Sequence, residues 1–194
     1  VGGLWKPCAG SVTPWNTHLG SEEYPHDARA FETATAVTDL EDQDAPEMAT
    51  YFGLDPGTMT MEEYRAAVNP YSYGFPTEVA VSEAGEATIA KHYAMGRLSV
   101  ELANVMPDRK TAYISNDGGN VGLFRFVADD EGDLGAGRLY AAKWVQISDE
   151  GGGAANLEWI DLGHSRDAEI GEMIAARTRF SDMFQTARIG TDGS

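Results

Sequence analysis

Residues 111–128, with the sequence TAYISNDGGNVGLFRFVA, decide the class of fold. Within them, Thr111–Ser115 and Val121–Ala128 are short runs of β-branched, aromatic and other apolar side chains, a composition that is typical of strands. Between the runs, residues 118–120 (Gly-Gly-Asn) tolerate the backbone conformations of a tight turn. The stretch therefore predicts two strands joined by a turn.

The same pattern continues on both sides of this stretch. Further strands are expected at residues 77–81, 87–93, 98–105, 138–147 and 157–162. Turn signals separate them at residues 83–86, 107–108, 129–133 and 151–153. Short strands about ten residues apart predict a mainly β protein built as a propeller, a sandwich or a barrel. The sequence has no clear internal repeat, so the spacing alone does not select the propeller.

Two parts of the chain have helical features. Within residues 25–70, the stretch 60–63 (Thr-Met-Glu-Glu) has the pattern of a capping box and predicts a short helix that ends near Val68. The acidic residues of 39–44 are expected in an exposed loop. We interpret residues 25–70 as a loop and helical insertion in a β framework. A C-terminal helix is predicted over residues 165–176, where apolar residues recur at helical spacing.

The chain is short and strongly acidic. Its 194 residues include 14 Lys and Arg against 31 Asp and Glu, and the net charge is −17. The length allows one or at most two domains. The charge argues against binding to nucleic acid or to an anionic lipid surface, because both require a basic face. It is compatible with bound cations and equally with an acidic, solvated surface. No stretch of about 18 apolar residues occurs, so no membrane span is expected.

Chemically reactive side chains are concentrated in residues 6–23, KPCAGSVTPWNTHLGSEE. The segment combines a thiol, an imidazole and two carboxylates, from Cys8, His18, Glu22 and Glu23. A thiolate together with carboxylates suits iron, whereas carboxylates with backbone oxygens suit calcium. The alternative is that Cys8 is an inert buried thiol and His18 a structural residue. Because Cys8 is the single cysteine, an internal disulfide and a cysteine-based zinc cluster are excluded.

Several segments, in order along the chain, match the motifs of one family. Residues 8–15 have the pattern Cys-Xaa-Gly-Xaa-Xaa-Thr-Pro-Trp and are followed by paired glutamates at 22–23, and residues 94–101 (AMGRLSVE) place a glutamate after Gly-Arg. The other matching segments are residues 69–79 (NPYSYGFPTEV), 111–117 (TAYISND), 123–128 (LFRFVA) and 134–144 (LGAGRLYAAKW). Together these segments resemble the PhoX-type alkaline phosphatase family.

The resemblance implies a β-propeller with helical embellishments, in an enzyme that hydrolyses phosphomonoesters with iron and calcium. In that pattern Cys8 matches the thiolate that binds iron, and Glu23 and Glu101 match metal-binding glutamates. Asp117 is a looser match to an aspartate on the calcium side. The sequence departs from the family at Val100, where the family often has histidine. Family members are exported, so the resemblance also implies a periplasmic or extracellular location.

The resemblance covers only the first part of the family domain. We therefore expect residues 1–194 to form a single domain that is an incomplete part of a larger propeller. Another chain or segment would complete it, and activity is expected of the complete enzyme. The alternative function is a non-catalytic, calcium-stabilised β-propeller module that assembles with itself or with a partner chain.

Further predictions concern side chains that the metal site does not use. Arg97 is a candidate contact for phosphate, because a guanidinium fork matches phosphate oxygens, and the alternative is a structural ion pair with Glu101 or with a neighbouring loop. His92 and His164 have no partners at metal-ligand spacing and are expected in structural or exposed positions. The tryptophans, Trp144 among them, are expected in the core.

Overall fold

The computed structural model describes residues 2–119 and 121–186. The chain divides into two compact units. The first comprises Val1–Pro25 and Tyr71–Glu172, and the second comprises His26–Pro70 and Met173–Ser194. The predicted site residues Cys8, Glu23, Arg97, Glu101 and Asp117 all belong to the first unit.

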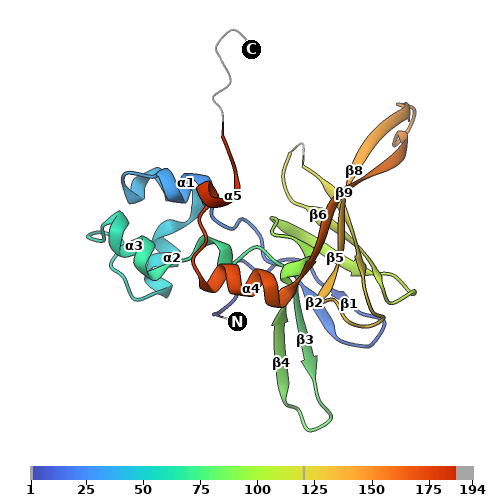
Figure 1. Cartoon of the computed structure of the whole chain (residues 1–194), viewed down its shortest axis with the longest axis horizontal. Helices are drawn as coiled ribbons and strands as arrows, with labels where there is room; N and C mark the ends of the chain where they lie inside the picture. Colours follow the sequence, from blue (N-terminus) through green and yellow to red (C-terminus); the bar gives the residue numbers. More distant parts are fainter. Residues whose placement is uncertain (1, 120, 187–194) are drawn as a thin grey trace. The chain divides into compact units, whose positions relative to one another are not determined.

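The first unit contains two antiparallel sheets (Figure 1). The four-stranded sheet consists of β1 (Ser11–Val12), β2 (His18–Gly20), β3 (Thr77–Val81) and β4 (Ala87–Lys91). The five-stranded sheet consists of β5 (Val100–Val105), β6 (Thr111–Asn116), β7 (Leu123–Ala128), β8 (Ala136–Ser148) and β9 (Ala154–Arg166). In both sheets each strand pairs with the next one along the chain. The mainly β class predicted from the strand spacing is therefore confirmed.

One face of the five-stranded sheet forms the core of the first unit. On β6, Ala112 and Ile114 are buried, whereas Tyr113 between them is 37% exposed, as the two-residue period of a strand requires. Leu19 on β2 is fully buried in the same apolar cluster. The two sheets of this unit therefore share a core.

The packing of β5 near the β1–β2 hairpin positions the candidate site. Ser11 Oγ on β1 donates a hydrogen bond to the carbonyl oxygen of Ala103 on β5, at 2.7 Å. The hairpin lies between Cys8 and Glu23 in sequence, and β5 carries Glu101. This contact therefore brings together segments that are far apart along the chain.

The last two strands, β8 and β9, form a long hairpin that extends beyond the other strands of its sheet (Figure 1). Each strand has 13 residues, more than the sequence predicted. Trp144 on β8 is 62% exposed, so the prediction that it lies in the core is wrong. Its cross-strand partner Leu157 is exposed as well. A periodic pattern identifies a strand, but it does not reveal that a hairpin extends past the core that would bury its apolar residues.

The second unit is helical. It contains α1 (Ala28–Thr33), the 3₁₀ helix η1 (Val37–Gln43), α2 (Ala45–Tyr51), α3 (Met61–Ala67) and α5 (Phe180–Met183). The predicted capping box is confirmed, because Thr60 Oγ1 accepts from the Glu63 amide and Glu63 Oε2 accepts from the Thr60 amide. The acidic stretch 39–44, predicted as a loop, falls largely within η1, where the fully buried Leu40 anchors the segment.

The remaining helices are short 3₁₀ turns and one C-terminal helix. The turns are η2 (Pro70–Ser72) and η3 (Tyr93–Met95). The helix predicted over residues 165–176 is α4 (Asp167–Ala175), and the boundary between the two units falls inside it. In the described part of the chain, no helix has both the length and the apolar character needed to cross a membrane. That residues 1–194 are one incomplete domain with an insertion at 25–70 stays a prediction.

Candidate metal centre

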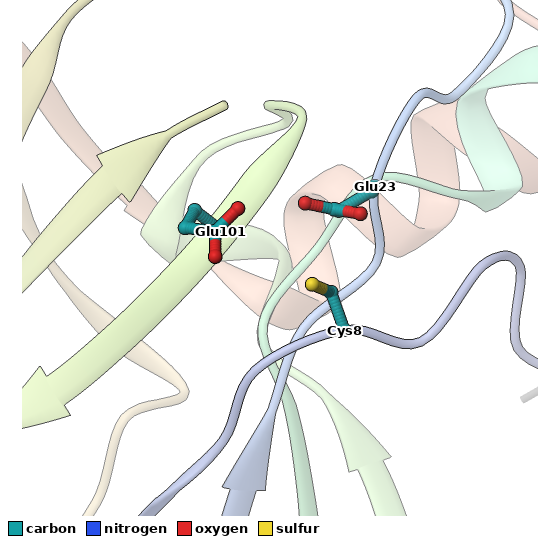
Figure 2. A group of neighbouring side chains, drawn as sticks. All are labelled: Cys8, Glu23 and Glu101. Atoms are coloured by element: carbon teal, nitrogen blue, oxygen red, sulfur yellow. The ribbon is translucent and has the colours of Figure 1, made fainter. Parts of the chain in front are cut away.

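Three of the predicted metal ligands lie together. The Sγ atom of Cys8 and a carboxylate oxygen from each of Glu23 and Glu101 are all within 4.8 Å of one another. The three side chains point toward one another, Glu101 from β5 and the other two from the loops before β1 and after β2 (Figure 2). Cys8 is exposed and the two glutamates are half-buried. The alternative prediction that the Cys8 thiol is buried is therefore wrong.

Unusual backbone conformations accompany the loops that carry Cys8 and Glu23. Lys6 and Tyr24 both have a φ of 44°, in the left-handed region that residues with a Cβ rarely adopt. The two loops are joined by a hydrogen bond from the Glu23 amide to the carbonyl oxygen of Lys6, at 3.0 Å. Backbone conformations of this kind collect at functional sites, where the surrounding structure holds them in place.

Crowding of acidic groups raises the pKa values in this cluster. The interaction with Glu23 raises the pKa of the Cys8 thiol, and partial desolvation and the negative charges of Glu23 and Glu101 add to the shift, whereas a backbone hydrogen bond from Ala9 opposes it. The pKa of Glu101 is raised by its hydrogen bond to Glu23, by burial, and by the charges of Glu23 and Asp117. The charges that shift the pKa of Glu101 are thus all negative. A cation among these ligands would favour the deprotonated forms and reverse both shifts.

The donor set fits the metals that the family resemblance implies. A thiolate is a soft ligand and a carboxylate a hard one, and iron accepts both, whereas calcium takes oxygen ligands. The Cys8 thiol therefore points to iron rather than to calcium alone.

Asp117, the fourth predicted metal residue, lies near this cluster but outside the three-ligand group. Its carboxylate accepts a hydrogen bond from the Tyr24 hydroxyl, which raises the pKa of Tyr24 to about 12. Ser99 links the two residues, because its Oγ accepts from the Tyr24 amide and its carbonyl oxygen accepts from the Asp117 amide, at 2.9 and 2.8 Å. Asp117 is therefore held beside Glu101 by the segment that precedes β5.

Arg97, the candidate contact for phosphate, packs against the segment at residues 71–73. Its Nε donates to the carbonyl oxygen of Tyr73 at 3.0 Å, and its guanidinium carbon lies 5.2 Å from the centroid of the Tyr71 ring. These contacts hold Nε and the plane of the Arg97 guanidinium group in place. Its role as a phosphate contact stays a prediction.

A second group of charged residues lies around His92, and in it the imidazole interacts with two carboxylates. His92 Nε2 is 2.8 Å from Glu78 Oε2, and Nδ1 is 3.4 Å from Asp167 Oδ2. Burial opposes the charged imidazolium, but hydrogen bonds and negative charge from both carboxylates outweigh burial and raise the pKa of His92 to about 9. Burial likewise opposes ionisation of Glu78, yet hydrogen bonds from His92, Thr17 and Trp15 lower its pKa to about 2. The structural role predicted for His92 agrees with these contacts.

Sequence reasoning assigned no separate role to Glu22 or to its partner Lys91. Glu22, the first of the paired glutamates, forms an ion pair with Lys91 at 2.8 Å, and both side chains are fully buried. Burial lowers the pKa of Lys91, and the Glu22 carboxylate opposes that shift. The available signal was the paired glutamates themselves, because neighbouring residues in an extended segment point to opposite sides.

The fold and the site together define a mainly β protein with a candidate metal centre made of one thiol and two carboxylates. The sequence model of the family "Alkaline phosphatase PhoX" matches residues 1–192. The chain therefore belongs to the PhoX alkaline phosphatase family, and the resemblance seen in the motifs is confirmed. No curated protein matches the chain.

The fold is similar to that of a solved structure, Pseudomonas fluorescens PhoX in complex with vanadate, a transition state analogue. The TM-score is 0.55 and the sequence identity 20%, and the match covers 96% of this chain and 36% of that one. The likeness confirms the expected fold class, which is mainly β and propeller-like. The chain spans only about a third of the solved relative, because the match includes 36% of that chain.

Proposed function

We propose that this chain contributes the thiolate and carboxylate ligands of the metal centre in a hydrolase of phosphomonoesters. One observation carries the proposal: Cys8, Glu23 and Glu101 come from three separate segments and have their ligand atoms within 4.8 Å of one another. Membership of the PhoX alkaline phosphatase family supports a phosphate ester as the substrate. Because the chain spans 36% of the solved relative, the activity is proposed for the complete family fold.

The metals we propose are iron and calcium. Cys8, Glu23 and Glu101 would hold iron, and Asp117 would contribute on the calcium side. When bound, such cations supply positive charge that offsets the negative charge spread over the phosphoryl oxygens in the transition state. The acidic chain supplies little positive charge of its own for this purpose, since its net charge is −17.

The residues of the chain have to prepare the site for a cation. The Cys8 thiol and the Glu101 carboxyl both have raised pKa values without a cation, and each binds a metal ion in its deprotonated form. Glu23 is the first cause of both raised pKa values, so it is the residue that links the other two candidate ligands. Tyr24 keeps Asp117 oriented through the hydrogen bond from its hydroxyl. Arg97 remains a proposed contact for a phosphate oxygen.

We also propose a periplasmic or extracellular location, in keeping with the exported family members. A segment or chain that completes the propeller is a further part of the proposal. The alternative function, a non-catalytic calcium-stabilised module, makes a different prediction about metal content and is separated from the enzyme by the experiment below.

Elemental analysis of the purified protein tests the metal centre. We expect iron and calcium in stoichiometric amounts, loss of iron in Cys8→Ala and Glu101→Gln, and retention of iron in Glu83→Gln. Glu83 is the matched control, because it is an exposed glutamate between β3 and β4. Hydrolysis of p-nitrophenyl phosphate by the metal-loaded protein, assayed with the completing segment, tests the reaction. Calcium without iron would favour the non-catalytic module, and neither metal would contradict the proposed site.

A further inference from the structure

The buried carboxylate of Glu22 has a complete set of hydrogen-bond donors. Its Oε1 accepts from Lys91 Nζ and from the Trp5 amide, both at 2.8 Å. Its Oε2 accepts from the amides of Gly74 and Phe75, at 3.0 and 3.2 Å. All four partners are donors, and they come from three separate stretches of the chain. The side chain therefore joins the N-terminal loop, the segment before β3 and the end of β4.

The backbone of Glu22 extends these connections to the remaining ligand segments. Its carbonyl oxygen accepts from the Val100 amide at 2.9 Å, and Glu22 forms an isolated β-bridge with Pro7. Each of these residues immediately precedes a candidate ligand in the sequence. The pairs are Pro7 and Cys8, Glu22 and Glu23, and Val100 and Glu101. The three ligands are thus one residue away from a single hydrogen-bonded frame.

We propose that Glu22, fixed by Lys91, is a positioning residue that sets the spacing of the three metal ligands. The inference rests on the proposed function, because it concerns the same site. A buried ion pair adds little stability by itself, since the cost of removing both charges from water offsets their attraction. Its value lies in fixing geometry, and residues that orient metal ligands are a regular requirement of metal sites. Glu22 reaches the metal only through the ligands that it positions.

The donors around Glu22 explain why a glutamate is needed. Glutamine has the same shape, but one of its two terminal atoms is an NH₂ group that donates. In either orientation this NH₂ group faces two of the four donors, so two hydrogen bonds are lost and the donors repel it. Glu22→Gln therefore disturbs the frame even though it changes no volume.

The test is a titration of the chain with Fe(II) alone, under anaerobic conditions, with a competing chelator. We expect Glu22→Gln to weaken Fe(II) binding by about 10- to 100-fold, the range for loss of a residue that orients a ligand. Glu78→Gln is the matched control, because it makes the same substitution at a carboxylate that is mostly buried and bonded to His92 rather than to the frame. Urea unfolding of both variants records the loss of stability. Equal weakening of Fe(II) binding in the two variants, at comparable stability, would overturn the inference.

A second measurement serves if Glu22→Gln does not fold. In the unaltered chain, Fe(II) binding should slow hydrogen exchange at the amides of Trp5, Gly74 and Phe75, which donate to Glu22, because coupling between two sites is reciprocal. The amide of Ala94, which donates to Asp167 at 2.7 Å, is the internal control. Equal slowing at all four amides would overturn the inference while leaving the metal site intact. Failure of the unaltered chain to bind Fe(II) would overturn the proposed function and this inference with it.

Discussion

Two groups of acidic side chains in the first unit differ in how their charge is balanced. Around His92, the imidazole lies between Glu78 and Asp167, which raises the pKa of His92 to about 9 and lowers that of Glu78 to about 2. Around Glu23, the neighbours are the Cys8 thiol and the Glu101 carboxyl, and the pKa values of both are raised. The first group carries its own cation, whereas in the second the neighbouring acidic groups disfavour one another's ionisation.

The difference separates a structural network from a ligand site. An acidic group that stabilises the folded state is found with donors or a positive charge, and the group around His92 has both. The acids around Glu23 disfavour one another's charge, so their proximity costs stability in the metal-free chain. Local conflicts of this kind are expected at functional sites, where a ligand offsets the cost. Changing a charge or a hydrogen-bond donor in either group should therefore alter metal binding or stability in a distinct way.

The largest effect is expected when a positively charged side chain is introduced into the group around Glu23. Glu23→Lys removes the residue shared by Cys8 and Glu101 and supplies a positive charge between them. Loss of a residue that orients a ligand costs up to about 100-fold in metal affinity, and Fe(II) affinity should fall by more than that here. The metal-free variant should unfold at a higher urea concentration than the unaltered chain, because acid crowding is relieved. Glu83→Lys, with the same change of charge at an exposed site, should show neither effect, and retained Fe(II) binding in Glu23→Lys would contradict the ligand assignment.

The group around His92 should make the free energy of unfolding depend on pH. The pKa of His92 is raised from 6.5 to about 9, so its contribution is complete below pH 6.5 and is lost as the pH rises through 9. The pKa of Glu78 is lowered from 4.5 to about 2, so its contribution is complete above pH 4.5 and is lost as the pH falls through 2. The network therefore stabilises most between pH 4.5 and 6.5.

Urea unfolding with a chelator present measures this dependence. Between pH 6 and pH 10, the free energy of unfolding should fall by about 3 kcal/mol through loss of charge on His92. In His92→Gln the same interval should lack that contribution. Equal slopes of stability against pH in the two proteins would show that His92 is not held charged in the folded state.

A smaller effect on stability is expected from the loss of one hydrogen-bond donor in the group around His92. Trp15 Nε1 donates to Glu78 Oε1 at 2.6 Å, and Trp15→Phe removes this bond while two other donors remain. The expected loss is about 1 kcal/mol in the free energy of unfolding, with the acid unfolding midpoint moving to higher pH. Trp159→Phe is the control, because its ring lies 4.5 Å from the Arg125 guanidinium instead. An unchanged acid midpoint in Trp15→Phe would separate Trp15 from the ionisation of Glu78.

The smallest effect is expected from Glu101→Gln in the metal-free chain, because water screens these accessible charges. The pKa of Glu101 is raised in the folded state, so its unfavourable contribution is absent below the ordinary value of 4.5 and grows as the pH rises through the raised value. Glu101→Gln should therefore be more stable than the unaltered chain at pH 8, and the two should converge below pH 4.5. A variant that is less stable at pH 8 would mean that Glu101 stabilises the fold.

Much of this architecture could be predicted from local sequence. The run of β-branched and aromatic side chains at residues 111–115 identified a strand, and Thr60 with Glu63 identified the start of a helix. The motif order singled out Cys8 and Glu101 as residues of one site, although β1 to β4 and most of the helices separate them along the chain. These features could be predicted because strands, helix starts and metal sites each require particular residue types at particular positions.

What could not be predicted depends on contacts between distant segments. Lys91 lies within a predicted strand, and only the folded structure shows that it forms an ion pair with Glu22. Asp117 matched a metal-side aspartate loosely, and the structure gives it a hydroxyl partner from Tyr24. Trp144 was wrongly assigned to the core because single-sequence patterns record which side chains are apolar but not which faces are covered.

The outer strand of the long hairpin has a consequence for the handling of this protein in solution. Within the described residues, β9 pairs with β8 along one edge only, and its Ile160 and Leu162 are 51% and 53% exposed. An uncovered edge of 13 residues with apolar side chains is a template for pairing with other chains. We expect association and precipitation to limit the concentration at which the isolated chain can be studied. A gatekeeper charge, introduced as Leu162→Lys, should raise the soluble yield without altering a metal ligand.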